Sequence, residues 1–329
     1  MNNFDIVVAI RHSNGTIDSR HVQPLKEFWY EDPSINIIRP LVGTELLDLL
    51  TNDLGIVTVD NEKLKLQYVK PGQRKDVNVN TESMKLLGRL AEALIVRRCN
   101  KDIRKNRVWA SYARRGREVA SLDKYIAIGT GLNSTKNNKL YHTKYSPSDT
   151  QRDIIWVKKD DPMKELQMGT IRNQGYRVGL QVKVSQNGAS VVKSLLNPEL
   201  NDMKYEVPIV YFDLKGDFFR VAENLRKETI LYAKRNWEIG VDIIAGRDID
   251  PELHDTLLHF HPLVKELLEG KLELSGLTQE LPELKTAITS RFIETTGIKL
   301  NLDLQYQQEI QILTLPILQL SSSLHEGNN

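Results

Sequence analysis

Apolar and polar residues alternate in several short stretches near the start of the chain, and this alternation predicts β-strands. Four stretches have the pattern, namely 4–10, 35–41, 55–60 and 63–69. Residues 43–53 have the period of a short helix. The polar stretch 69–80 contains Pro71 and Gly72 and no apolar period, so it is the predicted linker. Residues 1–75 are therefore expected to form a β-rich module that selects a substrate or a partner.

A long helical period begins near Thr81, which is the predicted N-cap of a helix with Glu82 in its first turn. One face of this helix is apolar and comprises Met84, Leu87, Leu90, Ala91, Leu94 and Ile95. At roughly 100° per residue, Glu92 falls on the edge of that face and not on the solvent side. A carboxyl group is therefore predicted at the margin of the core.

The pattern then changes to strands. Predicted strands are 123–132, 153–159, 176–188 and 205–217, followed by a helical stretch at 219–238. The composition of 133–152 predicts a loop, and 160–175 is expected to be a loop or a short helix. This order predicts an α/β core at 76–245, with helices outside a short mixed sheet. Residues 246–329 are expected to form a mostly helical region.

The strand predicted around residues 180–185 alternates strictly, with Leu180, Val182 and Val184 on one face. Gln181 and Lys183 project from the opposite face, about 6.6 Å apart at ~3.3 Å per residue. The pattern predicts a half-buried strand, and an amide and an ammonium on its polar face need a chemical explanation.

Phosphodiester hydrolysis offers such an explanation, because a hard cation must polarise the phosphate and help to make hydroxide. Mg²⁺ prefers oxygen ligands, of which one or two come from carboxylates. Asp153, which opens a predicted strand, and Glu92 can supply carboxylate oxygens, and Gln181 can supply a neutral one. Lys183 can position the water and offset charge on the phosphorus. Asp149 is the alternative to Asp153 as a metal ligand.

The sequence "DIIWV", followed 28 residues after Asp153 by Gln181 in "GLQVKVS", resembles the PD-(D/E)XK nuclease superfamily. It is most similar to the Mrr-type branch of restriction endonucleases, in which Gln replaces the acidic residue before X-Lys. The resemblance covers about 81–240 and implies a restriction-endonuclease-like core. It implies a Mg²⁺- or Mn²⁺-dependent DNA endonuclease of restriction or defence type, with Glu92, Asp153, Gln181 and Lys183 as catalytic residues. The first three of these would be the metal ligands.

Charge is unevenly distributed along the chain. Residues 81–120 carry 11 basic and 4 acidic side chains, whereas 250–329 carry 5 basic and 12 acidic ones. A basic window of this kind favours a polyanionic partner, and double-stranded DNA is the expected one. The residues expected to contact phosphates are Arg97, Arg98, Arg104, Lys105, Arg107, Arg114, Arg115 and Arg117. Trp109 and Tyr112, interleaved among them, are expected to belong to the core.

The composition excludes several other classes. Cys99 is the single cysteine, so an internal disulfide framework and a cysteine-rich zinc site are excluded. There is no apolar run long enough for a membrane span and no signal-peptide pattern, and a cytoplasmic location is expected. Double-strand cleavage needs two sites, so a homodimer is expected, with the Leu-rich helices between His254 and Ile298 as its interface.

Two alternatives remain open at this level. Because "QVK" lacks the second acid of the commonest motif, the chain can be read as a catalytically inactive nucleic-acid-binding module on a nuclease fold. The acidic C-terminal quarter also permits a structural or protein-interaction role.

Overall fold

A computed structural model describes residues 4–12, 16–24, 38–60, 63–68, 78–168, 177–197, 202–230, 238–277, 292–294, 296 and 308–316. The chain divides into two compact units. The first comprises Met1–Thr44 with Thr278–Asn329, and the second comprises Glu45–Leu277. Helix α1 (Ile38–Asp48) contains the boundary between them.

The first unit contains a three-stranded antiparallel sheet. Strand β1 (Phe4–His12) lies in the middle, paired with β2 (Ile17–Pro24) on one side and with β13 (Gln308–Pro316) on the other. Val8, Ala9 and Ile10 of β1 are buried. The sheet therefore joins the beginning of the chain to a segment near its end.

The second unit holds two three-stranded sheets. In the antiparallel sheet, β6 (Ile154–Lys158) lies between β5 (Tyr125–Gly129) and β7 (Asp161–Glu165). In the parallel sheet, β11 (Ile209–Asp213) lies between β8 (Gln181–Ser185) and β12 (Ile243–Ala245). An antiparallel bridge between Ile154 and Leu180 connects the two sheets at the starts of β6 and β8.

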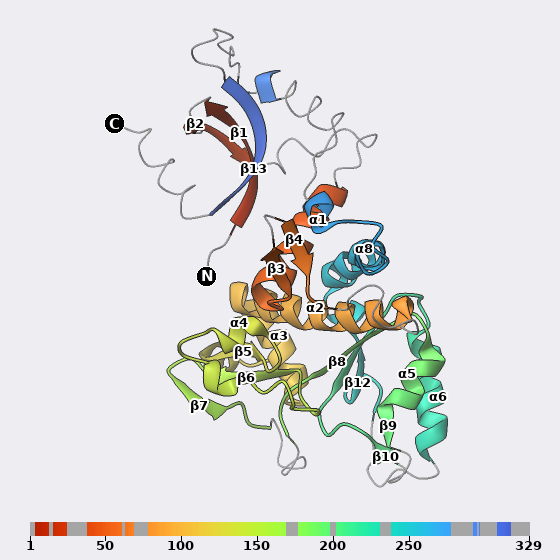
Figure 1. Ribbon diagram of the computed structural model, residues 1–329. Helices are drawn as coiled ribbons and strands as arrows, with labels where there is room; N and C mark the ends of the chain where they lie inside the picture. The colour runs from red at the N-terminus through yellow and green to blue at the C-terminus, as the bar shows by residue number, and fades with distance from the viewer. Residues whose placement is uncertain are drawn as a thin grey trace. The chain divides into compact units, whose positions relative to one another are not determined.

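Helices cover these sheets (Figure 1). Helix α2 (Val79–Lys101) contacts β5 and β8, one from each sheet, and also packs against α3 (Ile103–Ala113) and α8 (Pro251–Leu268). Helices α5 (Gly188–Leu195) and α6 (Phe218–Ile230) lie side by side. Because parallel strands are usually covered by helices on both faces, β8 and β11 are expected to be buried throughout. The described helices do not combine the length and hydropathy that a membrane crossing requires.

Short elements complete the second unit. They are η2 (Leu49–Asp53), β3 (Val57–Asp60), β4 (Lys63–Leu66), η3 (Ala120–Lys124), α4 (Asn133–Lys136), η4 (His142–Lys144), β9 (Leu196–Asn197), β10 (Asp202–Met203), α7 (Gly246–Ile249) and η6 (Leu274–Leu277).

The predicted mixed α/β class is confirmed, and several local predictions need correction. The stretch 35–41, expected as a strand, enters helix α1 at Ile38. Residues Asp161–Glu165, expected as a loop or a short helix, form strand β7. The N-cap of α2 is Asn78, whose side chain accepts a hydrogen bond from the Thr81 N–H, three residues before the expected helix start. The predicted linker lies mostly outside the described residues.

The observed units also differ from the predicted segments 1–75, 76–245 and 246–329. One reason is that β13 pairs with β1 along nine residue pairs. The local sequence pattern of either strand does not predict this pairing. The other is that α8 packs along α2, and its side chains Leu257, Phe260 and Val264 are fully buried. The hairpin of β3 and β4 also belongs to the unit that contains the core.

Candidate active site

The candidate site is built at the junction of β6 and β8. The backbone N–H groups of Asp153 and Ile154 donate to the Leu180 carbonyl oxygen at 2.9 and 3.1 Å, and the Leu180 N–H donates back to Ile154 O at 2.9 Å. This approach requires a glycine, because a Cβ at Gly179 would lie 2.8 Å from the Ile154 carbonyl oxygen. The junction thereby brings Asp153 next to Gln181.

The Asp153 carboxylate is held by β8. Its Oδ2 accepts a hydrogen bond from the Val182 backbone N–H at 2.7 Å and another from Gln181 Nε2. Burial raises the pKa of Asp153 from 3.8 to about 6, even though the Lys183 ammonium and these two hydrogen bonds favour the charged form. The raised pKa means that the folded chain pays free energy to keep this carboxylate ionised at neutral pH.

Helix α2 contributes the second carboxyl group. Burial raises the pKa of Glu92 well above its ordinary value, and the Asp153 carboxylate raises it further. Arg89, one turn earlier on α2, and Lys183 act in the opposite direction. The electrostatic interactions of Glu92 with Asp153 and Lys183 show that α2, β6 and β8 bring the predicted residues to one place. Two carboxyl groups and two cations therefore share a partly buried site.

Gln181 has an unsatisfied atom in this site. The side chain is only 4% exposed, and its Nε2 donates to Asp153. Its Oε1 is buried and has no hydrogen-bond partner among the described residues. A buried acceptor without a donor is costly, and such an atom in a native protein calls for a ligand, an ion or a water.

These donors fit a divalent cation. Asp153, Glu92 and Gln181 offer two carboxyl groups of raised pKa and one unpartnered amide oxygen, all of them hard oxygen donors. A cation would satisfy the amide oxygen and offset the repulsion between the carboxylates. In the part of the chain that the structure describes, no three His, Cys, Asp or Glu side chains form a metal-binding group. The unpartnered Oε1 of Gln181 is the group that could serve as the third donor beside the two carboxyl groups.

Lys183 lies on a strand that is covered on both faces. Gln181, Val182, Val184 and Ser185 are buried, and Lys183 itself is partly buried. The prediction that only one face of this strand is buried is therefore wrong, because helices cover the parallel sheet on both sides. Lys183 Nζ lies 5.0 Å from the centroid of the Tyr205 ring. Gln181 and Lys183 therefore do not lie on a strand face that is simply exposed to solvent.

Asp149, the alternative metal ligand, is already engaged. Its Oδ1 accepts from the backbone N–H groups of Gln151 and Arg152 at 3.0 and 3.2 Å. Its Oδ2 forms an ion pair with Arg152 Nε at 3.0 Å. Arg152 in turn pairs with Glu165 of β7 at 2.7 Å. Asp149 thus stabilises the turn before β6, and Asp153 is the carboxylate that lies against Gln181.

Most of the basic run is paired inside the protein. Five of the eight residues expected to contact phosphates form ion pairs: Arg97 with Asp48 and Asp53, Arg98 and Lys105 with Asp250 and Glu252, Arg107 with Asp123, and Arg115 with Asp242. The sequence suggested few internal partners, because Asp102 is the single acid within the run. The actual partners come from remote segments, so these five side chains have a structural role.

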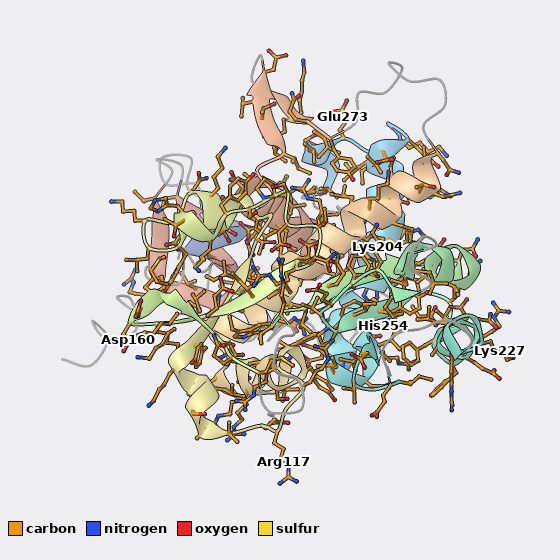
Figure 2. The ribbon with its side chains drawn as sticks, turned by 90° about the horizontal axis from the view of Figure 1, so that it is seen from below. Arg117, Asp160, Lys204, Lys227, His254 and Glu273 are labelled. Carbon is orange, nitrogen blue, oxygen red and sulfur yellow. The ribbon has the colours of Figure 1, made fainter. Side chains whose placement is uncertain are left out.

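Three residues of the run differ from the others. Arg104 and Arg117 are exposed, and Arg117 projects away from the ribbon in Figure 2. Arg114 is partly buried, and its Nε has no hydrogen-bond partner among the described residues. Trp109 is 1% exposed, which confirms its assignment to the core. A phosphate-binding role for this run is therefore reduced to Arg104, Arg114 and Arg117.

The leucines proposed as a dimer interface are largely internal. Within α8, Leu253, Leu257, Leu263 and Leu267 are buried inside the same chain. They do not provide an exposed apolar surface, and most of the residues from 278 to 298 lie outside the described residues. His254, labelled in Figure 2, is buried and stacks on Phe212 with ring centroids 6.4 Å apart, as a core histidine does.

Three residues near the site were not predicted. Arg89 lies three residues before Glu92, the spacing that places two side chains on one helix face, so periodicity offered a signal for it. Tyr205 had no such signal, because it approaches the site through tertiary packing. Gln151 is near Asp153 in the chain, but its hydrogen bonds to the backbone of Lys204 and Glu206 join segments more than 50 residues apart and had no signal in the sequence.

Comparisons with known proteins provide no relative. No protein-family model matches this chain, and no curated protein or solved structure matches it either. The candidate site therefore rests on its own geometry and chemistry.

Proposed function

We propose that this protein is a divalent-metal-dependent endonuclease that hydrolyses phosphodiester bonds of DNA. The supporting observation is the convergence of Glu92, Asp153, Gln181 and Lys183, which lie on three separate elements. Two carboxyl groups, an unpartnered amide oxygen and an ammonium form the set of groups that this reaction needs. A solvated strand face would not bury these groups together.

The order of elements supports the same proposal. Helix α2, strands β5, β6 and β8, and strand β11 follow one another as the resemblance to the PD-(D/E)XK superfamily implies. Asp153 immediately precedes β6, and Gln181 and Lys183 lie on β8. We therefore propose a restriction-endonuclease-like core of the Mrr type, in which β8 is the active-site strand.

The roles of the residues follow from their chemistry. Asp153, Glu92 and Gln181 would hold a Mg²⁺ or Mn²⁺ ion through their oxygens. When bound, the ion supplies Lewis-acid polarisation of the phosphate and lowers the pKa of a bound water. The Val182 N–H and Gln181 Nε2 orient the Asp153 carboxylate. Lys183 offsets the negative charge that develops on the phosphate oxygens in the transition state.

The partner proposed is double-stranded DNA. The exposed Arg104 and Arg117 are the residues of the basic run best placed to contact phosphates, which would provide affinity without sequence reading. Two strands require two cuts, so we keep the proposal of a homodimer. Its interface would not be built from the buried leucines of α8.

Cleavage of supercoiled plasmid tests this function directly. The full chain should convert plasmid to open-circular or linear DNA with Mg²⁺ or Mn²⁺ and leave it intact with EDTA. Lys183→Ala should lower the rate by about 10²–10³-fold, the usual effect of removing one electrostatic donor from an active site. Its thermal unfolding should remain like that of the wild type, so that a loss of folding is excluded.

Lys204→Ala is the matched control for this experiment. Lys204 is exposed and lies outside the group of four residues, so its replacement should leave the rate unchanged. A folded wild type that binds DNA and does not cut it with either metal ion would instead favour an inactive nucleic-acid-binding module.

A further inference from the structure

Tyr205 presents its ring to the lysine of the candidate site. Lys183 Nζ lies 5.0 Å from the centroid of this ring, within the range of a cation–π interaction. The tyrosine is 5% exposed and packs in a core cluster with Leu195, Met203 and Ile209. The ring is therefore held rigidly at the position where the ammonium meets it.

The backbone around Tyr205 is tied to the turn that carries Asp153. Gln151 Nε2 donates to the Lys204 carbonyl oxygen at 3.3 Å, and the Glu206 N–H donates to Gln151 Oε1 at 3.0 Å. One amide side chain thus brackets Tyr205 from both sides, and Gln151 lies two residues before Asp153. The Lys204 N–H also donates to Leu195 O, at the end of α5, at 2.8 Å.

We propose that Tyr205 is a positioning residue for Lys183, and that Gln151 sets its ring relative to Asp153. This inference rests on the proposed endonuclease function. A lysine side chain has four rotatable carbon–carbon bonds and a strongly hydrated point charge, so it does not hold one orientation by itself. The aromatic face supplies an attraction that fixes the ammonium without neutralising it.

The charges in the site explain why such a support is needed. Lys183 interacts electrostatically with Asp153 and Glu92, yet within the described residues no direct ion pair joins it to either carboxyl group. A close ion pair with Asp153 would occupy the protons that a phosphate oxygen must accept. By holding the ammonium over its ring, Tyr205 keeps those protons directed to the substrate.

Cleavage kinetics of three variants test the proposal. Tyr205→Leu removes the ring, and we expect kcat to fall about 3- to 30-fold, the range of cation–π energies, with KM within about twofold. Tyr205→Phe keeps the ring and should restore kcat to within about twofold of the wild type. Lys204→Ala, whose Nζ lies 5.5 Å from the same ring centroid, is the control and should keep the wild-type kcat.

A spectroscopic measurement tests the contact without requiring cleavage. Lysines of the full chain are labelled by reductive ¹³C-methylation, and the Lys183 signal is identified by its absence in Lys183→Arg. The ring current should shift this signal upfield in the wild type and in Tyr205→Phe, and the shift should disappear in Tyr205→Leu. If Tyr205→Leu does not fold, Gln151→Ala serves instead, with a smaller shift and a lower kcat expected.

The two measurements separate the possible failures. A wild type that cuts no DNA would contradict the proposed function, whereas a ring-shifted Lys183 signal would still support the role of Tyr205. An unshifted Lys183 signal in the wild type would overturn the positioning role. An unchanged kcat in folded Tyr205→Leu would also overturn it. A kcat in Tyr205→Phe that stays as low as that of Tyr205→Leu would have the same consequence.

Discussion

Replacement of Asp153 by Asn should make the metal-free protein more stable, while it abolishes cleavage. The carboxyl group of Asp153 has a pKa of about 6 in the folded chain and an ordinary value of 3.8. At about 1.4 kcal/mol per tenfold change in proton affinity, this difference corresponds to roughly 3 kcal/mol of destabilisation when the group is fully ionised. Asparagine removes the charge and keeps nearly the same shape.

The hydrogen bonds of the site allow this substitution. An asparagine oxygen in the place of Oδ2 can still accept hydrogen bonds from the Val182 N–H and from Gln181 Nε2. The two donors that hold the wild-type carboxylate therefore keep their acceptor in the variant. No buried donor or acceptor is newly lost, so the electrostatic gain should dominate.

The pH dependence gives this prediction its sign. Below pH 3.8 the group is protonated in both states and the variant has no electrostatic advantage. As the pH rises from 3.8 towards 6, the unfolded chain ionises Asp153 more readily than the folded one, so the wild type loses stability. The advantage of Asp153→Asn should thus grow over this interval and remain constant at about 3 kcal/mol above it.

Urea unfolding in EDTA at pH 4 and pH 8 measures the effect. At pH 8 the midpoint of Asp153→Asn should exceed that of the wild type, and at pH 4 the two midpoints should nearly coincide. Addition of Mg²⁺ should raise the wild-type midpoint and leave that of the variant almost unchanged, because only the wild type keeps the full ligand set. A variant that is less stable at pH 8, or equally shifted at both pH values, would refute this account of the site.

Three further predictions concern the metal ligand, the core and the DNA interface. Gln181→Glu should keep cleavage with an altered preference between Mg²⁺ and Mn²⁺, whereas Gln181→Ala should lose most of it; equal rates for Gln181→Ala and the wild type would remove Gln181 from the site. Asp250→Ala should lower the free energy of unfolding by about 3 kcal/mol, and urea titration measures this loss. Asp250 is 3% exposed, caps the N-terminus of α8, and forms ion pairs with Arg98 and Lys105 of the basic run. The double change Arg104→Ala and Arg117→Ala should flatten the dependence of log K on log salt by up to about 2, at ~0.9 per phosphate contact. Arg107→Ala, which breaks an internal ion pair, should leave the salt dependence unchanged in the same filter-binding or anisotropy assay.

The sequence by itself determined the elements of the candidate site. Alternation identified the strand of Gln181 and Lys183, and a helical period placed Glu92 at the edge of an apolar face. These features are local: side-chain direction repeats every two residues in a strand and about every 3.6 in a helix, so a short stretch of sequence suffices to read them. The mixed α/β class followed from the order of these elements for the same reason.

Only the tertiary structure decided which charges are neutralised. Arg98 and Asp250 are 152 positions apart, and Arg115 and Asp242 are 127 apart, yet each pair forms an ion pair. A count of charges near the basic run could not find these partners, because Coulomb attraction depends on distance in space and not on separation along the chain. The pairing of β1 with β13 escaped prediction in the same way, since an edge strand presents hydrogen-bonding groups that any other strand can satisfy. Burial of both faces of β8, and with it the raised pKa of Asp153, likewise arises only when remote helices cover the sheet.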